Sequence, residues 1–329
     1  MPEEALYYEK LSDNKVQCKL CPHQCVIADG KRGFCRVREN QNGQLQALNY
    51  GLVASVAMDP IEKKPLYHFY PGTRILSLGQ AGCTFHCQFC QNYSLLDPDI
   101  PQQSLPPEQA VAMAKQENSL GIAYTYNEPY VGFEYVLDTA REAKKADLKN
   151  VLVTNGYYMP DPWEKLSPLI DGMNIDLKSM RDEFYKEYIN GGLAPVQQTI
   201  KSALQKGIHV ELTTLLITGL NDSEEEMREL VGYVAGLDPD LPLHLSRYHP
   251  AYKMDRPATP PETLKQAYEI AREQLNYVYI GNIMGVGGTD SECPRCGAVL
   301  VNRSGYSTHI VGLEGNKCGE CGGEVNFAN

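Results

Sequence analysis

Between Arg74 and Ile280, short apolar runs alternate with longer segments whose apolar positions recur with a helical period. Such an alternation predicts strands and helices in turn. The predicted strands are Arg74–Leu78, Gly121–Tyr126, Asn150–Thr154, Gly172–Leu177, His209–Ile217 and Leu243–Tyr248, with a strand-like Tyr277–Ile280 at the end. The predicted helices are Pro107–Glu117, Glu134–Ala146, Trp163–Leu169, Arg181–Tyr188, Gln197–Lys206, Ser223–Ala235 and Pro261–Leu275.

Strand–helix units of this length imply a parallel sheet with right-handed crossover connections. Six consecutive units predict an α/β fold, namely a partial (β/α)6 TIM-like barrel, with a doubly wound sheet as the alternative. One helix start is marked in the sequence. Asp222 or Ser223 is a suitable N-cap, and acidic residues that favour the helix dipole follow in the first turn.

The eleven cysteines fall into three tight clusters of four, three and four. In a long chain whose start has neither the basic nor the apolar region of a secretory signal, such clusters are typical of metal ligands rather than disulfides. We therefore expect a reducing, cytoplasmic compartment. The clusters are Cys18, Cys21, Cys25 and Cys35; Cys83, Cys87 and Cys90; and Cys293, Cys296, Cys318 and Cys321.

The middle cluster is a Cys-x-x-x-Cys-x-x-Cys loop directly after the first predicted strand. Three thiolates this close in the chain can hold one face of an iron–sulfur cube and leave one iron open to a reactant. Phe89, just before the last cysteine, would shield one side of that cluster from water. A half-built zinc site and three unrelated buried cysteines are the alternatives.

Each of the two flanking clusters supplies four thiolates. The first, in which glycines allow the turn back to Cys35, fits structural zinc, which we prefer, or a closed iron–sulfur cluster. His23, within this cluster, is expected to face solvent. The last cluster is a pair of Cys-x-x-Cys knuckles typical of a zinc ribbon. We therefore expect a metal-binding module with its lead-in at residues 1–72, the barrel at 73–284 and the ribbon at 285–329.

Composition narrows the partners. The chain has 329 residues, 43% of them apolar, which suffices for one barrel-sized domain with small appendages. Its formal net charge is −11, and this argues against nucleic acid as the main partner because phosphate binding needs a basic surface. No apolar run reaches the ~18 residues of a membrane-spanning helix, so we expect no membrane partner.

Polar side chains lie at or after the ends of the predicted strands, and along the fifth of them, where parallel barrels carry their reacting groups. Loops are polar in any case, but recurrence at all six strand ends, beside a three-thiolate loop, predicts a functional site there. After the cysteine loop these residues are, in chain order, Asn127 and Glu128, Thr154 and Asn155, Asp176 and Lys178, Thr213 and Thr214, and Tyr248 and His249.

The cysteine loop, with its aromatic residue before the third cysteine, resembles the radical S-adenosylmethionine (SAM) superfamily. The chain is similar to the pyruvate formate-lyase (glycyl-radical) activating enzymes, although both glycines of their Gly-Gly-Glu-Pro motif are replaced before Glu128. Val153 replaces an acid of those enzymes, which argues against a cation site there. A closer resemblance, to the AmmeMemoRadiSam-system radical SAM proteins, rests on Cys-x-Leu-Cys-Pro-His-x-Cys near the start, the segment 59–72, Tyr-Asn-Glu-Pro and the ribbon.

The resemblance implies a 4Fe–4S cluster on the middle cysteines, which binds SAM at its open iron and cleaves it to a 5′-deoxyadenosyl radical. It also implies roles for the polar residues at the strand ends. Glu128 accepts a hydrogen bond from the methionine ammonium of SAM, and Asn127 holds the loop. Thr154 and Asn155 contact the carboxylate or the ribose, and Asp176 contacts a ribose hydroxyl or the ammonium. Lys178 pairs with the SAM carboxylate or an acidic substrate, and His249 touches adenine or donates a proton. The alternatives are an Asp176–Lys178 ion pair and an ordered loop role for His249.

Hydrogen abstraction from a protein or peptide is the main functional hypothesis, with the two metal modules as docking surfaces. The expected cofactors are a 4Fe–4S cluster, SAM and zinc, and the expected electron donor is a protein of the flavodoxin or ferredoxin type. Radical chemistry on a small molecule and a multi-metal scaffold without catalysis are the alternatives. The acidic balance disfavours a nucleic-acid substrate.

Overall fold

The computed structural model describes residues 2–329 and has a mixed eight-stranded sheet at its centre. Seven strands run parallel, and β8 pairs antiparallel with β9 at one edge. From one edge to the other the strands are β16 (Val278–Gly281), β15 (Leu243–Arg247), β14 (His209–Leu216), β13 (Gly172–Asp176), β12 (Lys149–Thr154), β11 (Gly121–Tyr124), β9 (Arg74–Gly79) and β8 (Ser55–Pro60).

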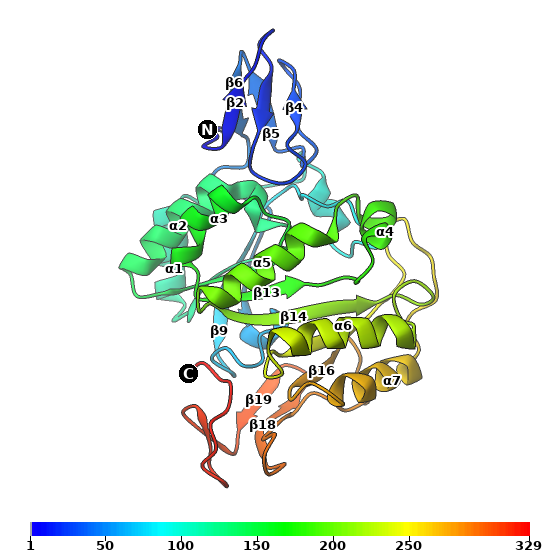
Figure 1. The fold of residues 1–329 in the computed structure, drawn as a ribbon. Helices are drawn as coiled ribbons and strands as arrows, with labels where there is room; N and C mark the ends of the chain where they lie inside the picture. The colour runs from blue at the N-terminus through cyan, green and yellow to red at the C-terminus, as the bar shows by residue number, and fades with distance from the viewer. Residues whose placement is uncertain (1) are drawn as a thin grey trace.

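Helices connect the parallel strands and pack along the sheet (Figure 1). They are α1 (Pro107–Gln116), α2 (Phe133–Lys145), α3 (Pro160–Leu166), α4 (Asp182–Phe184), α5 (Leu193–Gln205), α6 (Glu224–Leu237) and α7 (Pro261–Arg272). Short turns of other helical types adjoin three of these helices: η4 (Ser167–Leu169) extends α3, η5 (Tyr185–Ile189) extends α4, and η3 (Pro129–Gly132) precedes α2. Two more, η1 (Ile61–Lys63) and η2 (Tyr93–Leu96), lie in loops.

The alternation of strands and helices predicted from the sequence is confirmed, as all six predicted strands and the strand-like Tyr277–Ile280 appear in one sheet. α5 begins at Leu193, four residues before the predicted start. Ser223 is the N-cap of α6, since its side chain accepts a hydrogen bond of 3.2 Å from the backbone N–H of Glu226. The antiparallel strand β8 was not predicted as part of this sheet.

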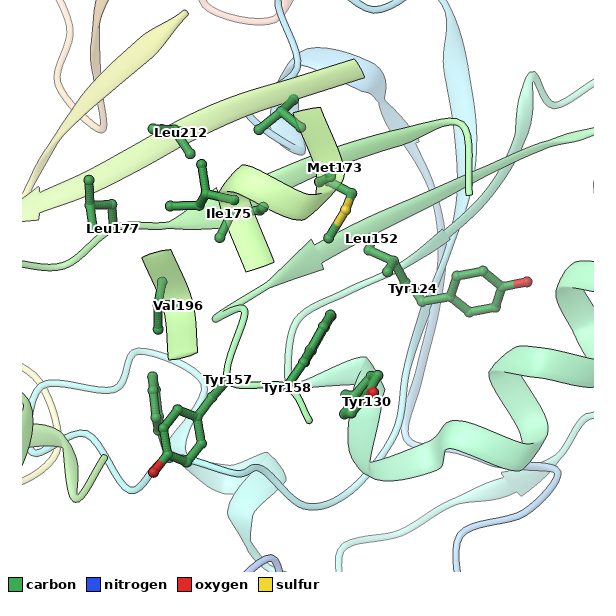
Figure 2. Close-up of a cluster of buried hydrophobic side chains, with 14 of the residues drawn as sticks. Tyr124, Tyr130, Leu152, Tyr157, Tyr158, Met173, Ile175, Leu177, Val196 and Leu212 are labelled. Carbon is green, nitrogen blue, oxygen red and sulfur yellow. The ribbon is translucent and has the colours of Figure 1, made fainter. Parts of the chain in front are cut away.

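The core between the sheet and its helices is made of interlocking apolar side chains. Figure 2 shows Leu152, Met173 and Ile175 from neighbouring strands. Next to them the rings of Tyr130 and Tyr158 stack with their centroids 3.7 Å apart. These two tyrosines follow β11 and β12, so the core packing reaches up to the loops at the carboxyl ends of the strands.

The N-terminal residues form two small antiparallel sheets at one end of the molecule (Figure 1). Arg38 anchors them to the central sheet and its helices, because its guanidinium makes a buried ion pair of 2.6 Å with Glu134 on α2. The strands are β1 (Glu3–Glu4), β6 (Gln44–Ala47) and β5 (Arg38–Gln41) in one sheet and β2 (Tyr8–Lys10), β3 (Val16–Cys18) and β4 (Val26–Ile27) in the other; β7 (Leu52–Val53) pairs with β10 (Gln103–Ser104).

The C-terminal residues form short strands at the opposite end of the molecule (Figure 1). They dock on the segment before β9: the ring of His68 stacks on Phe327 at 3.9 Å, and the guanidinium of Arg303 donates to the carbonyl of Tyr67 at 2.6 Å. The strands are β17 (Ser291–Glu292), β18 (Val299–Ser304), β19 (Ser307–Ile310), β20 (Leu313–Glu314) and β21 (Lys317–Cys318).

A search of residues 2–329 finds no helix with both the length and the apolar character that crossing a membrane requires.

His68 gives the fold a dependence on pH. Burial lowers the pKa of His68 to about 3, whereas a histidine in the unfolded chain titrates near 6.5. Between these values the unfolded chain binds the extra proton, so stability is complete above pH 6.5 and falls as the pH decreases. We expect the free energy of unfolding to lose about 2 kcal/mol from His68 between pH 7.5 and pH 5. Urea titrations at both pH values measure it.

The control is His68→Phe, which keeps an aromatic ring against Phe327 but has no proton to bind. Its stability should change less between pH 7.5 and pH 5 than that of the wild type. Equal losses in the two proteins would show that His68 is not the titrating group.

Candidate functional site

The Cys83–Cys90 loop follows β9 at the carboxyl end of the parallel strands. It is held by backbone hydrogen bonds to η5, since His86 N–H donates to Ile189 O at 3.0 Å and Gln88 N–H donates to Tyr188 O at 2.9 Å. Phe89, predicted to shield a cluster, is 3% exposed. The loop is therefore fixed by the backbone of a neighbouring element and by apolar packing.

Gly82 lets this loop approach the N-terminal module. Its φ is +93°, and a Cβ there would lie 2.7 Å from a methyl group of Val37 and 2.8 Å from the carbonyl oxygen of Cys35. Only glycine fits such a conformation at such a distance. The start of the cysteine loop and the first cysteine cluster are thus in direct contact.

Burial raises the pKa of the Cys83 thiol well above its usual range and that of Cys87 to about 12. At neutral pH these thiols are neutral unless a cation binds them, because metal binding displaces the proton. Within residues 2–329, the C-terminal cysteines are the one group of three or more histidine, cysteine or acidic side chains whose ligand atoms all lie within 4.8 Å of one another. Cys83, Cys87 and Cys90 do not form such a group in the described part of the chain.

Asn127 and Glu128, both predicted as site residues, lie next to this loop. The Asn127 side chain accepts from the N–H of Gln80 at 3.2 Å and donates to the carbonyl of Gly82 at 2.8 Å. It therefore fixes the entry into the cysteine loop, as expected of a residue that holds the shape of the site.

Glu128 is 1% exposed, and burial raises the pKa of its carboxyl to about 7. The carboxylate accepts from the backbone N–H of Tyr130 at 3.0 Å and of Asn155 at 2.8 Å, and from the Thr154 hydroxyl at 2.9 Å. A carboxylate has about four acceptor positions, so these three donors leave room for one more. Glu128 thus ties the loop after β11 to the end of β12.

Thr154 and Asn155 connect Glu128 to the cysteines. The Asn155 amide donates to Thr84 Oγ1 at 2.9 Å and lies 3.8 Å from the Cys83 sulfur. Thr154 is held between Glu128 and the hydroxyl of Tyr158 at 2.7 Å. The structure therefore brings four predicted site residues together in one chain of contacts that ends on a cysteine: Glu128, Thr154, Asn155 and Cys83.

Asp176 and Lys178 form an ion pair of 2.9 Å, which is one of the two arrangements considered from the sequence. Lys178 also lies 5.8 Å from the centre of the Phe89 ring, and its charge lowers the pKa values of Cys87 and Cys90 against the larger effect of burial. The ammonium group is therefore close enough to act on the cysteine loop. The Asp176 side chain is about one third exposed and accessible to a ligand.

Other predicted strand-end residues lie elsewhere. The hydroxyl of Thr213 donates to Asn174 and that of Thr214 to the carbonyl of Leu177, so both cross-link β14 to β13. His249 is half-buried, and its Nε2 lies 3.4 Å from the carbonyl of Asn282. No contact joins its ring to the cysteine loop within residues 2–329.

Two residues after β15 were missed by sequence reasoning. Lys253 N–H donates to Gln88 O at 2.9 Å, and the ring of Tyr252 stacks on Tyr93 at 5.0 Å. The loop after β15 therefore folds over the cysteine loop. Tyr252 has a φ of +56°, which no motif in the sequence indicates.

The C-terminal cysteines have the geometry of a single-ion site. Cys293 Sγ lies 3.8 Å from Cys321 Sγ, and Cys296 Sγ lies 3.7 Å from Cys318 Sγ. A tetrahedral ion with metal–sulfur bonds of about 2.3 Å separates its sulfur ligands by about 3.8 Å. This four-cysteine site at residues 293–321 can hold a metal ion.

The first cluster, Cys18, Cys21, Cys25 and Cys35, surrounds a cavity whose wall includes Thr84 of the cysteine loop. His23, expected to face solvent, is half-buried, and its Nε2 lies 2.8 Å from the Thr84 carbonyl.

Comparisons with known proteins match the part of the chain that contains these residues. Residues 78–232 match the family model of the Radical SAM superfamily. The chain is 45% identical over 332 residues to the uncharacterized protein MJ0808 of Methanocaldococcus jannaschii, an alignment that covers 98% of this chain and 99% of that protein. It is 25% identical over 187 residues to pyruvate formate-lyase 1-activating enzyme of Escherichia coli, covering 54% of this chain and 75% of that enzyme.

Among solved structures, SuiB of Streptococcus suis bound to precursor peptide SuiA aligns with a TM-score of 0.52 and 16% identity, covering 69% of this chain and 52% of that one. This likeness shows a shared fold.

The contact at Gly82 predicts a matched pair of variants. Gly82→Ala and Gly207→Ala both place a side chain at a positive φ, but a Cβ at Gly207 meets nothing within 4 Å. We expect Gly207→Ala to cost about 1–2 kcal/mol from backbone strain alone. Gly82→Ala should cost at least about 2 kcal/mol more, since Val37 and the Cys35 carbonyl must move. Urea unfolding measures both, and equal costs would contradict the close approach.

Proposed function

Since the chain belongs to the radical SAM superfamily and is a radical SAM enzyme, we propose that it uses SAM to abstract hydrogen from a protein or peptide substrate. The observation that carries the SAM-dependent part of this proposal is the chain of contacts from Glu128 through Asn155 to Cys83, the first of three cysteines in one loop. When bound, the 4Fe–4S cluster and SAM supply one-electron cleavage of the carbon–sulfur bond and a 5′-deoxyadenosyl radical.

The residues present fit such a cluster. Cys83, Cys87 and Cys90 provide three thiolates, and the Asn155 amide points a donor at one of the sulfurs. The ammonium of Lys178 offsets part of the negative charge that the partly buried thiolates of Cys87 and Cys90 bring. Hydrogen bonds and nearby charge are the means by which a protein tunes the potential of an iron–sulfur cluster.

The roles of the polar residues remain as the resemblance implies. In this proposal Glu128 accepts from the SAM ammonium with its remaining acceptor position, a charge-assisted bond, while Asn127 holds the loop. Thr154 and Asn155 serve the carboxylate or ribose, and Asp176 serves a ribose hydroxyl or the ammonium. Lys178 pairs with the SAM carboxylate or with an acidic group of the substrate. His249 is assigned to adenine or to proton donation.

A protein or peptide substrate is supported by the relatives alone. One is named as the activating enzyme of pyruvate formate-lyase, and SuiB was solved with a precursor peptide. Within the superfamily we assign the chain to the AmmeMemoRadiSam system, in a reducing cytoplasm, with a flavodoxin- or ferredoxin-type electron donor. Family membership argues against the non-catalytic scaffold. A small-molecule substrate is the competing outcome of the experiments below.

The proposal also includes the three-part division of the chain: an N-terminal metal-binding module at residues 1–72, a partial (β/α)6 barrel at 73–284 and a C-terminal zinc ribbon at 285–329. Zinc on the ribbon is supported by sulfur separations of 3.7 and 3.8 Å.

The first test is SAM cleavage. Protein reconstituted with iron and sulfide without oxygen, reduced and given SAM should release 5′-deoxyadenosine, detected by chromatography. The variant in which Cys83, Cys87 and Cys90 are all alanine should release none, because no open iron remains. Release at the wild-type rate by this variant would contradict the proposal. The wild-type protein is then incubated with deuterated peptide extracts and, separately, with deuterated small-molecule extracts. The extract that contains the substrate is the one whose deuterium appears in the 5′-deoxyadenosine.

The second test concerns Glu128. Glu128→Gln replaces one acceptor oxygen by an NH2 group that faces either the Tyr130 or the Asn155 N–H, donor against donor. We expect SAM cleavage to slow by ~10-fold or more, the effect of one lost charged hydrogen bond. The matched control is Glu142→Gln on the outer part of α2, which should cleave SAM at the normal rate. Wild-type turnover in Glu128→Gln would remove Glu128 from the site.

A further inference from the structure

The first cysteine cluster lies against the cysteine loop and has its own cavity. The cavity is lined by all four cysteines, by Thr84 and by the buried side chain of Arg38. We propose that Cys18, Cys21, Cys25 and Cys35 bind a second 4Fe–4S cluster, with every iron held by the protein. The spacing of these cysteines in the sequence is compatible with structural zinc or with a closed iron–sulfur cluster, and we choose the iron–sulfur cluster.

The separation of the sulfurs distinguishes a cluster from a single ion. The ribbon cysteines come within 4.8 Å of one another, as four ligands of one ion must. No three of the first four cysteines do so among the residues that the structure describes, and neither do Cys83, Cys87 and Cys90. In a cube each cysteine binds a different iron, so its sulfurs lie further apart than around one ion. The first cluster therefore groups with the Cys83 loop and not with the ribbon.

The backbone around the cavity is arranged for anionic sulfur. Phe34 N–H donates to Cys25 Sγ at 3.4 Å. The Cys25 sulfur thus has a backbone donor of the kind that the thiolate ligands of an iron–sulfur cluster accept.

Arg38 adds an unpartnered donor at the same cavity. The residue is 1% exposed, and its terminal nitrogens bind Glu134 and the Val131 carbonyl. Its Nε–H is buried and finds no acceptor within residues 2–329. A buried N–H of this kind requires an acceptor, which a bound group or a water molecule can supply. Cluster sulfides and thiolates are acceptors of the kind this N–H requires.

The position of this site links it to the SAM-binding loop. Phe34, which lines the cavity, stacks on His86 of the cysteine loop with ring centroids 4.0 Å apart. His23 contacts the Thr84 carbonyl at 2.8 Å, and the Cys35 carbonyl touches Gly82. The first cysteine cluster therefore adjoins the Cys83 loop through Thr84 and through the Phe34–His86 pair.

The experiment uses full-length protein in which Cys83, Cys87 and Cys90 are alanine, so that the SAM-binding cluster is absent. After anaerobic reconstitution, we expect ~4 irons and ~4 sulfides per chain, about one zinc, and a cubane EPR signal after reduction. Because each iron has a protein ligand, added SAM should leave that signal unchanged. This inference does not rest on the proposed function, since the variant cannot cleave SAM in either case.

Two further variants in the same background separate the metal sites. Cys21→Ala with Cys35→Ala should abolish the remaining iron and keep the zinc. Cys296→Ser with Cys321→Ser, at two exposed ribbon positions, should lose the zinc and keep the iron. Two zinc ions with less than one iron in the triple variant, or chains without metal at the first cluster, would overturn the proposal. The triple variant decides the question even where the Cys21 and Cys35 variant fails to fold.

Discussion

One buried carboxylate holds the candidate site together. Glu128 has almost no contact with water, yet it accepts bonds from two backbone N–H groups and one hydroxyl on two different loops. Burying such a charge is unfavourable, and the rise of its pKa to about 7 is the sign of that cost. The hydrogen bonds offset this cost only when the loop after β11 and the end of β12 lie close enough for all three donors to reach the carboxylate. The carboxylate therefore selects one arrangement of the two loops, and Asn155 reaches Cys83 from it.

The three sets of cysteines show that the distances between sulfur atoms in the fold say more about the bound metal than the spacing of cysteines in the sequence does. Both four-cysteine sets contain a Cys-x-x-Cys pair, and both read as zinc sites from the sequence. In the fold, the ribbon closes its sulfurs to single-ion distances, whereas the N-terminal set surrounds a cavity. The difference arises from the partners of the loops: the ribbon closes on its own short strands, and the N-terminal set closes on Thr84 and Val131 of another part of the chain.

Much of the fold could be predicted because short, mainly apolar runs alternate with segments of helical period, and β9 and β11 to β16 follow from that alternation. β8 could not be, because Met58, Asp59 and Pro60 interrupt any alternation and its pairing depends on a distant partner. The positions of the predicted strand ends identified the loops that form the candidate site, but they did not predict in which direction each side chain points. Hence Glu128 and Asn155 lie at the site, while Thr213 and Thr214 turn to β13. Lys253 acts through its backbone, which leaves no trace in residue type.

The docking of the last residues on the segment before β9 has a consequence for biosynthesis. The carbonyl of Ala328 accepts from the Tyr70 N–H at 2.7 Å, and the N–H of Ala328 donates to the His68 carbonyl at 2.9 Å. A ribosome delivers Tyr70 long before Ala328, and domains form as the chain emerges. The aromatic rings around His68 thus stay uncovered during translation until Phe327 and Ala328 have left the exit tunnel, and the nascent chain exposes this apolar surface until then.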